Sequence, residues 1–501
     1  MIVATAEIMR NIDNYCSETL RIPSIILMEN AALAVLKNAA IDKYYSYVLV
    51  CGTGNNGGDA LAVARHLHVN NKKIEVFLVG PIDKMSKDCT INYHILRNMD
   101  IKVKNVTKAE DINEIRDAIN RSEVVIDGLF GTGLNRRLEE IYDLCISAIN
   151  EYSKYTISID APSGMNSDEG VVLGNCVRAN KTISFQLYKK GFLKYGIEKY
   201  TGEVVIENIG IPESVVDKFH RNEFIMDKTM VNSWLRKRGK YEHKGDFGKV
   251  MIIAGSKGFT GAAYISTEGA VKSGAGLVTL CCPEEIRDTL SMKLVEAMTI
   301  SFDEKDKFEQ IMKRCDAIAI GPGLGNNENT YKLVSYLIRN SKCPIVIDAD
   351  GINVLKDKLE LLQEKNADII ITPHFGEMAR LTGFTVEEIK DNRLNIAKEF
   401  AKQHGVTVLL KGFNSVITDG NLTIVNSSGN SSMASGGMGD CLTGMITSFI
   451  GQGYKSMKAA CIAAFIHGYC GEKLSIENFC VSASEVLVSI PMYIKEIIDC
   501  K

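Results

Sequence analysis

The sequence predicts an α/β protein with two domains, each built on a mainly parallel sheet. Short apolar stretches alternate with helical ones along the chain, which is the pattern of strands joined by covering helices. Runs such as 124–126 are apolar without alternation, as expected for strands that helices cover on both faces. The 501 residues also exceed what one core needs, since a domain usually has about 100–200 residues.

The composition is that of an ordinary globular enzyme, with 46% hydrophobic residues and a formal net charge of −3. Because the charge is near neutral and no apolar run is long enough for a membrane span, we expect neither nucleic acid nor a membrane as a partner. No signal peptide is evident, and the 14 cysteines include no C-x-x-C pair, so we expect reduced thiols in a cytoplasmic protein. Abundant small residues permit assembly, and we expect a homo-oligomer.

The first half opens with two predicted helices over 6–40 and a short apolar strand over 47–51. That strand runs into a glycine-rich loop, 52–59, which a helix over 60–68 follows. Strand, glycine-rich loop and helix in this order bind phosphate at the crevice of a doubly wound, Rossmann-like sheet. The glycines fit G-x-G-x-x-G, but an NAD-dependent dehydrogenase also needs an acidic residue about 20 positions further on, where the fit is poor.

Carboxylates next to glycines end several strands of this half. Further strands are predicted near 74–79, 101–105, 123–127, 155–160 and 181–185. We expect Asp59, Asp127 and Asp160 to face one crevice, because the carboxyl ends of parallel strands meet at one edge. One aspartate there is usually a turn residue, whereas three beside glycines favour a functional site. The Asn, Asp and Ser oxygens of these loops suit a hard cation better than zinc.

Four motifs of this half together point to a known family. They are Leu27–Ala31, Gly54–Asp59, Asp127–Leu134 and Asp160–Gly164, and with them this half resembles the NAD(P)H-hydrate epimerase domain. The resemblance implies Asp160 as the acid/base and a potassium ion held by Asn56, Asp127 and Ser163. The hydrate contacts that it implies are Asn55, Asn56, Gly57, Gly58, Asp59, Gly131, Thr132, Gly133, Leu134, Asn135, Arg136, Arg137, Asp160 and Lys189. Ala60 departs from the family, which commonly has glycine there.

The chain changes character between about 210 and 245, where the pattern loses its strands and becomes charged. We interpret this part as a linker that leads into the second domain. A fresh apolar strand follows it, so we place the boundary near residue 220, with domains 1–219 and 220–501.

The second half again alternates strands and helices. Its predicted strands lie near 249–254, 277–282, 316–320, 344–348, 368–372 and 406–410. Glycine-bearing turns follow several of them, which indicates a wide polar crevice for a large, phosphate-bearing ligand. Here His374 is either a packed residue or a ligand contact, and Lys411 either contacts a nucleotide phosphate or forms a salt bridge. Asp348 and Asp350 either bind a metal or cap their turn.

Near the end of the chain, three glycines within 436–439 precede Asp440, and apolar residues at helical spacing follow it. This pattern predicts a glycine-rich loop that opens a helix, whose unpaired N–H groups form an anion site. A carboxylate beside a bound anion is unfavourable unless it has a function, such as taking a proton from an attacking hydroxyl. The alternative is that Asp440 caps the helix.

The Gly-Met-Gly-Asp motif, on an α/β body, resembles the ribokinase-like fold. With Lys272–Leu277, Gly321–Gly325, Thr372–Glu377 and Lys411–Gly412 it resembles the ADP/ATP-dependent NAD(P)H-hydrate dehydratase. The resemblance implies Asp440 as the catalytic base and Mg²⁺ bound with ADP or ATP. The implied hydrate contacts are Ala263, with Ala262 one position away as the other choice, Gly323, His374 and Asp440. The implied nucleotide contacts are Lys411, Gly412, Phe413, Asn414, Ser415 and Gly439.

The two resemblances cover nearly the whole chain and imply a bifunctional enzyme that repairs hydrated NAD(P)H. Its first domain would interconvert the R and S hydrates, and its second would dehydrate the S form at the expense of ADP or ATP. A vitamin or sugar kinase of the ribokinase type is the main alternative, but it leaves the first domain unexplained. A non-catalytic scaffold would not need Asn56, Asp127 and Asp160 together.

Overall fold

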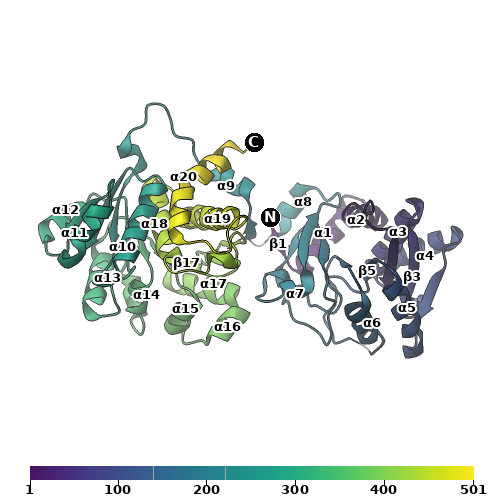
Figure 1. Ribbon diagram of the computed structural model, residues 1–501. Coiled ribbons are helices and arrows are strands. Elements are labelled where there is room, and N and C mark those ends of the chain that lie inside the picture. Colours follow the sequence, from purple (N-terminus) through teal and green to yellow (C-terminus); the bar gives the residue numbers. More distant parts are fainter. Residues whose placement is uncertain (139, 221, 501) are drawn as a thin grey trace. The chain divides into compact units, whose positions relative to one another are not determined.

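The computed structural model describes residues 1–138, 140–220 and 222–500. The chain divides into two compact units, Met1–Arg221 and Asn222–Lys501. Each unit is a largely parallel sheet with helices on both faces, so the predicted α/β class is confirmed (Figure 1). Within the described residues, no helix is both long and apolar enough to cross a lipid bilayer.

The N-terminal unit contains a seven-stranded parallel sheet with the order β4-β3-β2-β5-β6-β7-β9. Its strands are β2 (Ser46–Cys51), β3 (Lys73–Val79), β4 (Val103–Val106), β5 (Val124–Gly128), β6 (Thr156–Ile159), β7 (Lys181–Phe185) and β9 (Glu203–Glu207). The chain winds outward in one direction from β2 and then returns to β5 on its other side. This reversal creates a crevice beyond the carboxyl ends of β2 and β5, where ligands bind in such sheets.

Helices cover both faces of this sheet. One face packs against α1 (Ala6–Asn14), α2 (Ser24–Asn38), α3 (Asn55–Val69), α4 (Lys87–Asn98) and α8 (Glu213–Phe219). The other face packs against α5 (Ile112–Arg121) and α6 (Glu140–Tyr152). Two short strands, β1 (Val3–Ala4) and β8 (Tyr188–Lys189), pair with each other outside this sheet. A short helix, α7, spans Glu198–Thr201.

The C-terminal unit contains a ten-stranded sheet with the order β10-β19-β18-β17-β16-β15-β14-β11-β12-β13, in which only β18 is antiparallel to its neighbours. Its strands are β10 (Glu223–Met226), β11 (Lys249–Ile253), β12 (Leu277–Cys282), β13 (Met298–Ser301), β14 (Ala317–Ile320), β15 (Ile345–Ile347), β16 (Ile369–Ile371), β17 (Thr407–Leu410), β18 (Ser415–Thr418) and β19 (Thr423–Asn426).

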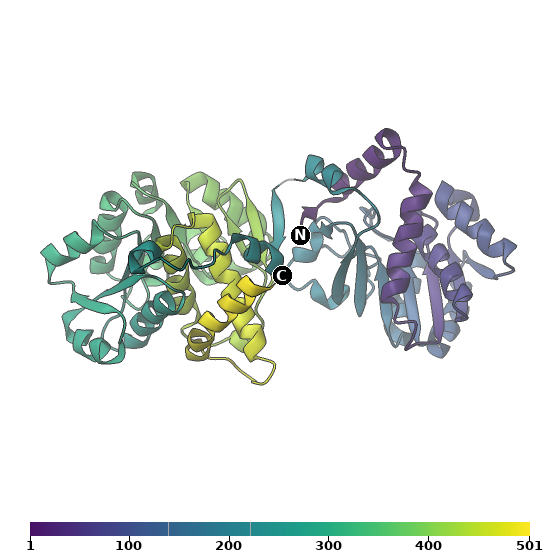
Figure 2. The ribbon, with the colours of Figure 1, turned by 90° about the horizontal axis from the view of Figure 1, so that it is seen from above.

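Two helical layers enclose this second sheet. The first contains α9 (Lys228–Trp234), α10 (Thr260–Lys272), α11 (Glu284–Lys293), α18 (Met438–Gly451), α19 (Ser456–Leu474) and α20 (Ala483–Asp499). The second contains α12 (Lys305–Met312), α13 (Glu328–Asn340), α14 (Asp350–Asn353), α15 (Phe375–Thr382), α16 (Val386–Asp391) and α17 (Arg393–His404). Figure 2 shows the last three helices, in yellow, grouped together on this unit.

The prediction that strands are lost between 210 and 245 is wrong. This part contains α8, β10 and α9, and β10 forms the edge of the second sheet by pairing with β19. Its four residues are too few to show a period, and its partner lies near the other end of the unit. The strands β9, β13, β18 and β19, which lie toward the edges of the two sheets, were also not predicted. The helix predicted from Ala60 already begins at Asn55, because its glycines adopt helical backbone.

Candidate active sites

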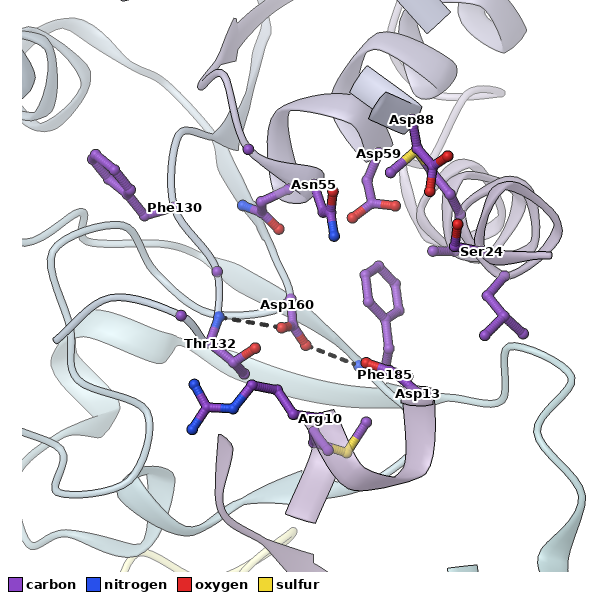
Figure 3. A pocket seen from close by; sticks show the side chains of 18 of the residues that line it. Arg10, Asp13, Ser24, Asn55, Asp59, Asp88, Phe130, Thr132, Asp160 and Phe185 are labelled. Carbon is purple, nitrogen blue, oxygen red and sulfur yellow. Dashed lines mark hydrogen bonds between the residues drawn. The ribbon is translucent and has the colours of Figure 1, made fainter. Parts of the chain in front are cut away.

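A cavity of about 700 Å³ opens at the crevice of the first sheet. Its walls come from α1, α2, the start of α3 and the loops that follow β2, β5 and β6 (Figure 3). Most of the hydrate contacts predicted for this unit line it, namely Asn55, Asn56, Asp59, Gly131, Thr132, Gly133, Leu134, Asn135, Arg136, Asp160 and Lys189. The carboxyl edge of the sheet therefore carries a cavity at the place where the sequence predicts ligand contacts.

Gly57 and Gly58 do not line this cavity, which corrects their predicted role as contacts. A Cβ on Gly57 would lie 1.7 Å from the carbonyl oxygen of Gly52, and one on Gly58 would lie 2.7 Å from Cε of Met28. Both glycines thus let α3 pack against its neighbours without a side chain in between. Arg137, also predicted as a contact, lies outside the cavity lining and is exposed.

Asp160 follows β6 with φ of 62°, a left-handed conformation that non-glycine residues rarely adopt. Its Oδ1 lies 3.0 Å from Nζ of Lys189, and its Oδ2 accepts a hydrogen bond of 3.4 Å from the backbone N–H of Thr132. Lys189 is 1% exposed and also donates to the carbonyl oxygens of Phe185 and Leu187, at 2.9 and 3.2 Å. All three N–H groups of the Lys189 ammonium thus have oxygen partners in the protein, and Lys189 holds Asp160 in place.

Asp127, at the end of β5, is fully buried and lies next to Ser163. Its Oδ1 accepts from the Ser163 hydroxyl at 2.5 Å, and its Oδ2 accepts from the Ser158 hydroxyl at 2.8 Å and from the Ser163 N–H at 2.9 Å. Burial raises the pKa of Asp127, while these hydrogen bonds oppose the rise. In the described part of the chain, the buried side-chain nitrogen of Asn56 has no hydrogen-bond partner.

Two cavity carboxylates, Asp13 on α1 and Asp88 on α4, were not predicted from the sequence. Asp13 is exposed to the cavity, but the protein around it removes much of its hydration. Desolvation is the larger cause, and the negative charge of Asp160 the smaller one, that raise the pKa of Asp13 to about 6. Neither residue carries a local signal, since Asp13 lies on the polar side of an amphipathic helix and Asp88 resembles an ordinary first-turn carboxylate.

In the C-terminal unit, Lys411 directly follows β17 and forms ion pairs with protein carboxylates, and its predicted nucleotide contact stays a prediction. Its Nζ lies 2.8 Å from Oδ1 of Asp348 and 4.0 Å from Oε2 of Glu377. Burial lowers the pKa of Lys411, but the two carboxylates outweigh it and raise the pKa above its ordinary value. Asp348 also accepts from the hydroxyl of Thr443 on α18, at 2.7 Å, so this carboxylate links two loops and the helix. Asp350 accepts from the Gly325 N–H at 2.8 Å and ties its turn to the loop after β14.

Asp440 lies in the first turn of α18, as predicted, and the helix N-cap is Gly437 with φ of 87°. Because the cap is a glycine, Asp440 does not serve as the N-cap. A Cβ on Gly439 would lie 3.2 Å from Nζ of Lys411 and 3.7 Å from Oδ2 of Asp348, so the helix start meets this ion pair. Burial, followed by the charge of Asp348, raises the pKa of Asp440 to about 6, against the opposing effect of Lys411.

His374 caps α15, since its Nδ1 accepts from the backbone N–H groups of Gly376 and Glu377 at 2.9 and 3.2 Å. Its side chain is 53% exposed, and its Nε2 lies 3.5 Å from Oε1 of Glu377. The predicted contact Ala263 is fully buried in the core, which corrects that prediction. Its neighbour Ala262 instead faces the loop after β14. A Cβ added to Gly323 in that loop would lie 3.0 Å from Cβ of Ala262.

The remaining predicted nucleotide contacts form the turn between β17 and β18. Gly412 has φ of 154° and Asn414 has φ of 56°, and the side chain of Phe413 is half exposed. The Ser415 hydroxyl donates to the carbonyl oxygen of Gly412 at 2.8 Å and closes the turn. This turn follows Lys411 directly, so it borders the same end of the sheet as Asp440.

Both units thus place carboxylates and glycine-rich helix starts at the carboxyl edge of a parallel sheet, which defines a two-domain α/β enzyme. A family model described as YjeF-related protein N-terminus matches residues 24–191, and one described as NAD(P)H-hydrate dehydratase matches 250–492. The chain belongs to the family of bifunctional NAD(P)H-hydrate repair enzymes, and it joins an epimerase domain to a dehydratase domain.

Two relatives with that name match along nearly the whole chain. The protein of Moorella thermoacetica is 35% identical and the match covers 94% of this chain and 92% of that protein. The protein of Dictyoglomus turgidum is 34% identical, and the match covers 99% of both. The crystal structure of ADP/ATP-dependent NAD(P)H-hydrate dehydratase from Bacillus subtilis, obtained with ATP and Mg²⁺, has a TM-score of 0.51 and 30% identity, and it covers 55% of this chain and 98% of that chain.

Proposed function

We propose that the C-terminal unit transfers a phosphoryl group from ADP or ATP to the hydroxyl of the S hydrate, and that Asp440 accepts the hydroxyl proton. The phosphorylated oxygen then leaves as inorganic phosphate, the neighbouring ring carbon loses a proton to water, and the ring double bond of the dihydropyridine is restored. The observation that carries this proposal is the position of Asp440 at the start of α18, beside the Lys411–Asp348 pair. The free N–H groups of that helix start stabilise the transferring phosphoryl group.

Lys411 and the turn from Gly412 to Ser415 contact the nucleotide, and His374, Gly323 and Ala262 contact the hydrate. Mg²⁺ accompanies the nucleotide and neutralises phosphate charge; the Bacillus subtilis relative was crystallised with ATP and Mg²⁺. In this arrangement the positive charge of Lys411 remains next to the phosphates, because its carboxylate partners raise its pKa.

A single assay separates this function from the kinase alternative. The chain is incubated with NADH hydrate and ADP or ATP, and the return of NADH absorbance is followed. A dehydratase restores the absorbance and releases phosphate, whereas a ribokinase-type kinase leaves a stable phosphorylated product. Absence of NADH recovery with both nucleotides would overturn the proposal.

In the N-terminal unit, the proposed acid/base is Asp160, which supplies the S hydrate by interconversion of the two epimers. Its support is the exposure of Asp160 to the cavity together with its ion pair to buried Lys189. Lys189 acts as a positioning residue here, in place of the direct substrate contact that the sequence predicts.

We further propose a potassium ion held by Asn56, Asp127 and Ser163. The donor set fits, since it consists of hard oxygens with one negative charge in total. The Ser163 hydroxyl lies 3.2 Å from the Phe130 carbonyl oxygen, so it can donate there and free Oδ1 of Asp127 for the ion. The ion would supply a fixed positive charge between the loops after β2, β5 and β6.

For the chain as a whole, we propose a homo-oligomer in the reducing cytoplasm. Its 14 cysteines are all free thiols, which supports that compartment. Exposed large apolar side chains on the second unit, such as Phe479 and Val488, are compatible with self-association. Light scattering of the purified chain tests the oligomer, and a monomer would overturn it.

A further inference from the structure

The carboxyl group of Asp59 differs from those of Asp127 and Asp160, which hydrogen bonds and an ion pair hold in place. Asp59 lies on α3, is 9% exposed and lines the cavity of the first unit. Among the described residues, no hydrogen bond or ion pair reaches its carboxyl group, whereas Asp127 accepts several hydrogen bonds. A buried ionised carboxylate without a donor is strongly unfavourable, so this environment favours the neutral acid.

The charges around Asp59 favour its acid form further. Three carboxylates face the same cavity, those of Asp160 after β6, Asp13 on α1 and Asp88 on α4 (Figure 3). The cations that line the cavity are Arg10, Arg136 and Lys189, and Lys189 is paired with Asp160. Burial, followed by the charges of Asp160, Asp13 and Asp88, raises the pKa of Asp59 well above its ordinary value. The cavity therefore offers a neutral acid among carboxylates that stabilise a positive charge.

The chemistry of the hydrate matches this combination. Water adds to the ring double bond of NADH so that the hydroxyl stands on the carbon next to the ring nitrogen. If that hydroxyl leaves as water, the nitrogen lone pair forms a double bond to the carbon and a ring iminium cation results. Water can return to either face of this flat cation, which interconverts the epimers.

We propose that Asp59 is the proton donor of epimerisation and that the reaction passes through loss and return of water; this inference rests on the proposed epimerase function. Asp59 gives its proton to the hydroxyl oxygen, and the carbon–oxygen bond breaks with its electron pair on the departing water. A water then forms a new carbon–oxygen bond on the other face, and Asp160 takes its proton. Proton exchange with solvent restores Asp59 as the acid and Asp160 as the carboxylate.

The test uses the full chain without nucleotide, so that the second unit cannot act. The S hydrate is incubated with the chain in oxygen-18-labelled water. The R hydrate that forms is separated, and its mass is measured by mass spectrometry. We expect one labelled oxygen in each R molecule formed. Retention of the original oxygen would overturn the inference, because ring opening and reclosure can interconvert the epimers without losing it.

The matched variants are Asp59→Asn, which keeps the size of the side chain, and Asp117→Asn, which changes an exposed carboxylate on α5. We expect Asp59→Asn to slow epimerisation about 10²–10⁴-fold, the usual contribution of a positioned acid, and Asp117→Asn to leave it unchanged. An Asp59→Asn chain with the wild-type rate would overturn the role of Asp59.

A stability measurement tests the proton on Asp59 without substrate. A carboxyl group that holds its proton in the folded chain but loses it in the unfolded chain destabilises the fold as pH rises above its ordinary pKa. The melting temperature of Asp59→Asn relative to wild type should therefore increase as pH rises from about 4 to 8. A constant difference would overturn the inference alone. If the melting temperatures diverge as expected but the wild-type chain does not interconvert the epimers, the proposed epimerase function is overturned. The catalytic role of Asp59 then falls with it.

Discussion

At the scale of single residues, the two aspartates proposed as acid/base groups lie in different surroundings. Asp160 is fixed by a buried lysine and two backbone N–H groups, at a strained φ that only a well-packed turn maintains. Asp440 instead follows a glycine cap and lies near a lysine that other carboxylates already hold. For Asp440 this environment raises the pKa to about 6, chiefly through burial, which brings its proton exchange near neutral pH.

Replacing Asp440 by asparagine should remove the base and leave the shape of the site intact. We expect nucleotide-driven dehydration to fall about 10²–10⁴-fold while epimerisation continues. Recovery of NADH absorbance measures the first activity, and chromatography of the two epimers measures the second. Asp391→Asn, at an exposed position on α16, is the control. Unchanged dehydration in Asp440→Asn would refute the role of Asp440.

The pH dependence of dehydration follows from the raised pKa of Asp440. Since the base must be ionised, the rate should be low below pH about 6, rise through that value and level off above it. Single-turnover rates between acidic and neutral pH provide the measurement. A rate that is already maximal well below that range would show that another group takes the proton.

At the scale of elements, both sites depend on a helix that starts directly after a glycine-rich turn. In α3 the glycine at position 57 faces the Gly52 carbonyl so closely that no side chain fits. In α18 the glycine at position 437 adopts a left-handed cap conformation, and Asp440 lies in the first turn that follows it. The glycines therefore set the position of each helix, and the polar residues beside them set its chemistry.

Replacing Gly57 by alanine should destabilise the first unit by about 1–3 kcal/mol, because the new methyl group overlaps backbone that cannot move away without shifting α3. Gly133→Ala is the control, since a Cβ there meets nothing within 4 Å. Thermal unfolding of both variants measures the difference. Equal melting temperatures would contradict the packing role of Gly57.

Removal of potassium should affect only the first unit. If the ion lies between Asn56, Asp127 and Ser163, replacing potassium by choline should slow epimerisation and lower the melting temperature of that unit. Dehydration of pure S hydrate should continue, and Ser163→Ala should lose most of the response to potassium. Equal melting curves in the two salts would refute the ion site.

At the scale of the whole molecule, two independent cores carry the two activities. Among the described residues, each buried hydrophobic cluster draws its members from one unit only. The product of the first unit is a small molecule that can diffuse to the second. The two activities should therefore separate on mutation and combine again between chains.

A mixture of two single variants tests this independence. Asp160→Asn alone should convert only the S hydrate to NADH, and Asp440→Asn alone should only interconvert the epimers. Together they should consume both epimers, because the S hydrate formed on one chain is dehydrated on the other. Failure of the mixture while each variant keeps its remaining activity would show that the epimer does not pass through solution.

The sequence by itself determined the α/β class, the central strands of both sheets and the polar, glycine-rich loops that border the first cavity. These features depend on local patterns, since apolar runs, glycine turns and carboxylates at strand ends are readable within a few residues. Only the tertiary structure decided that short strands such as β10 complete the sheets, that Ala263 is buried and that Lys189 holds Asp160. It also brought Asp13 and Asp88 to the cavity from separate helices. Such contacts join residues far apart in the chain, and no local pattern encodes which distant partner packing will supply.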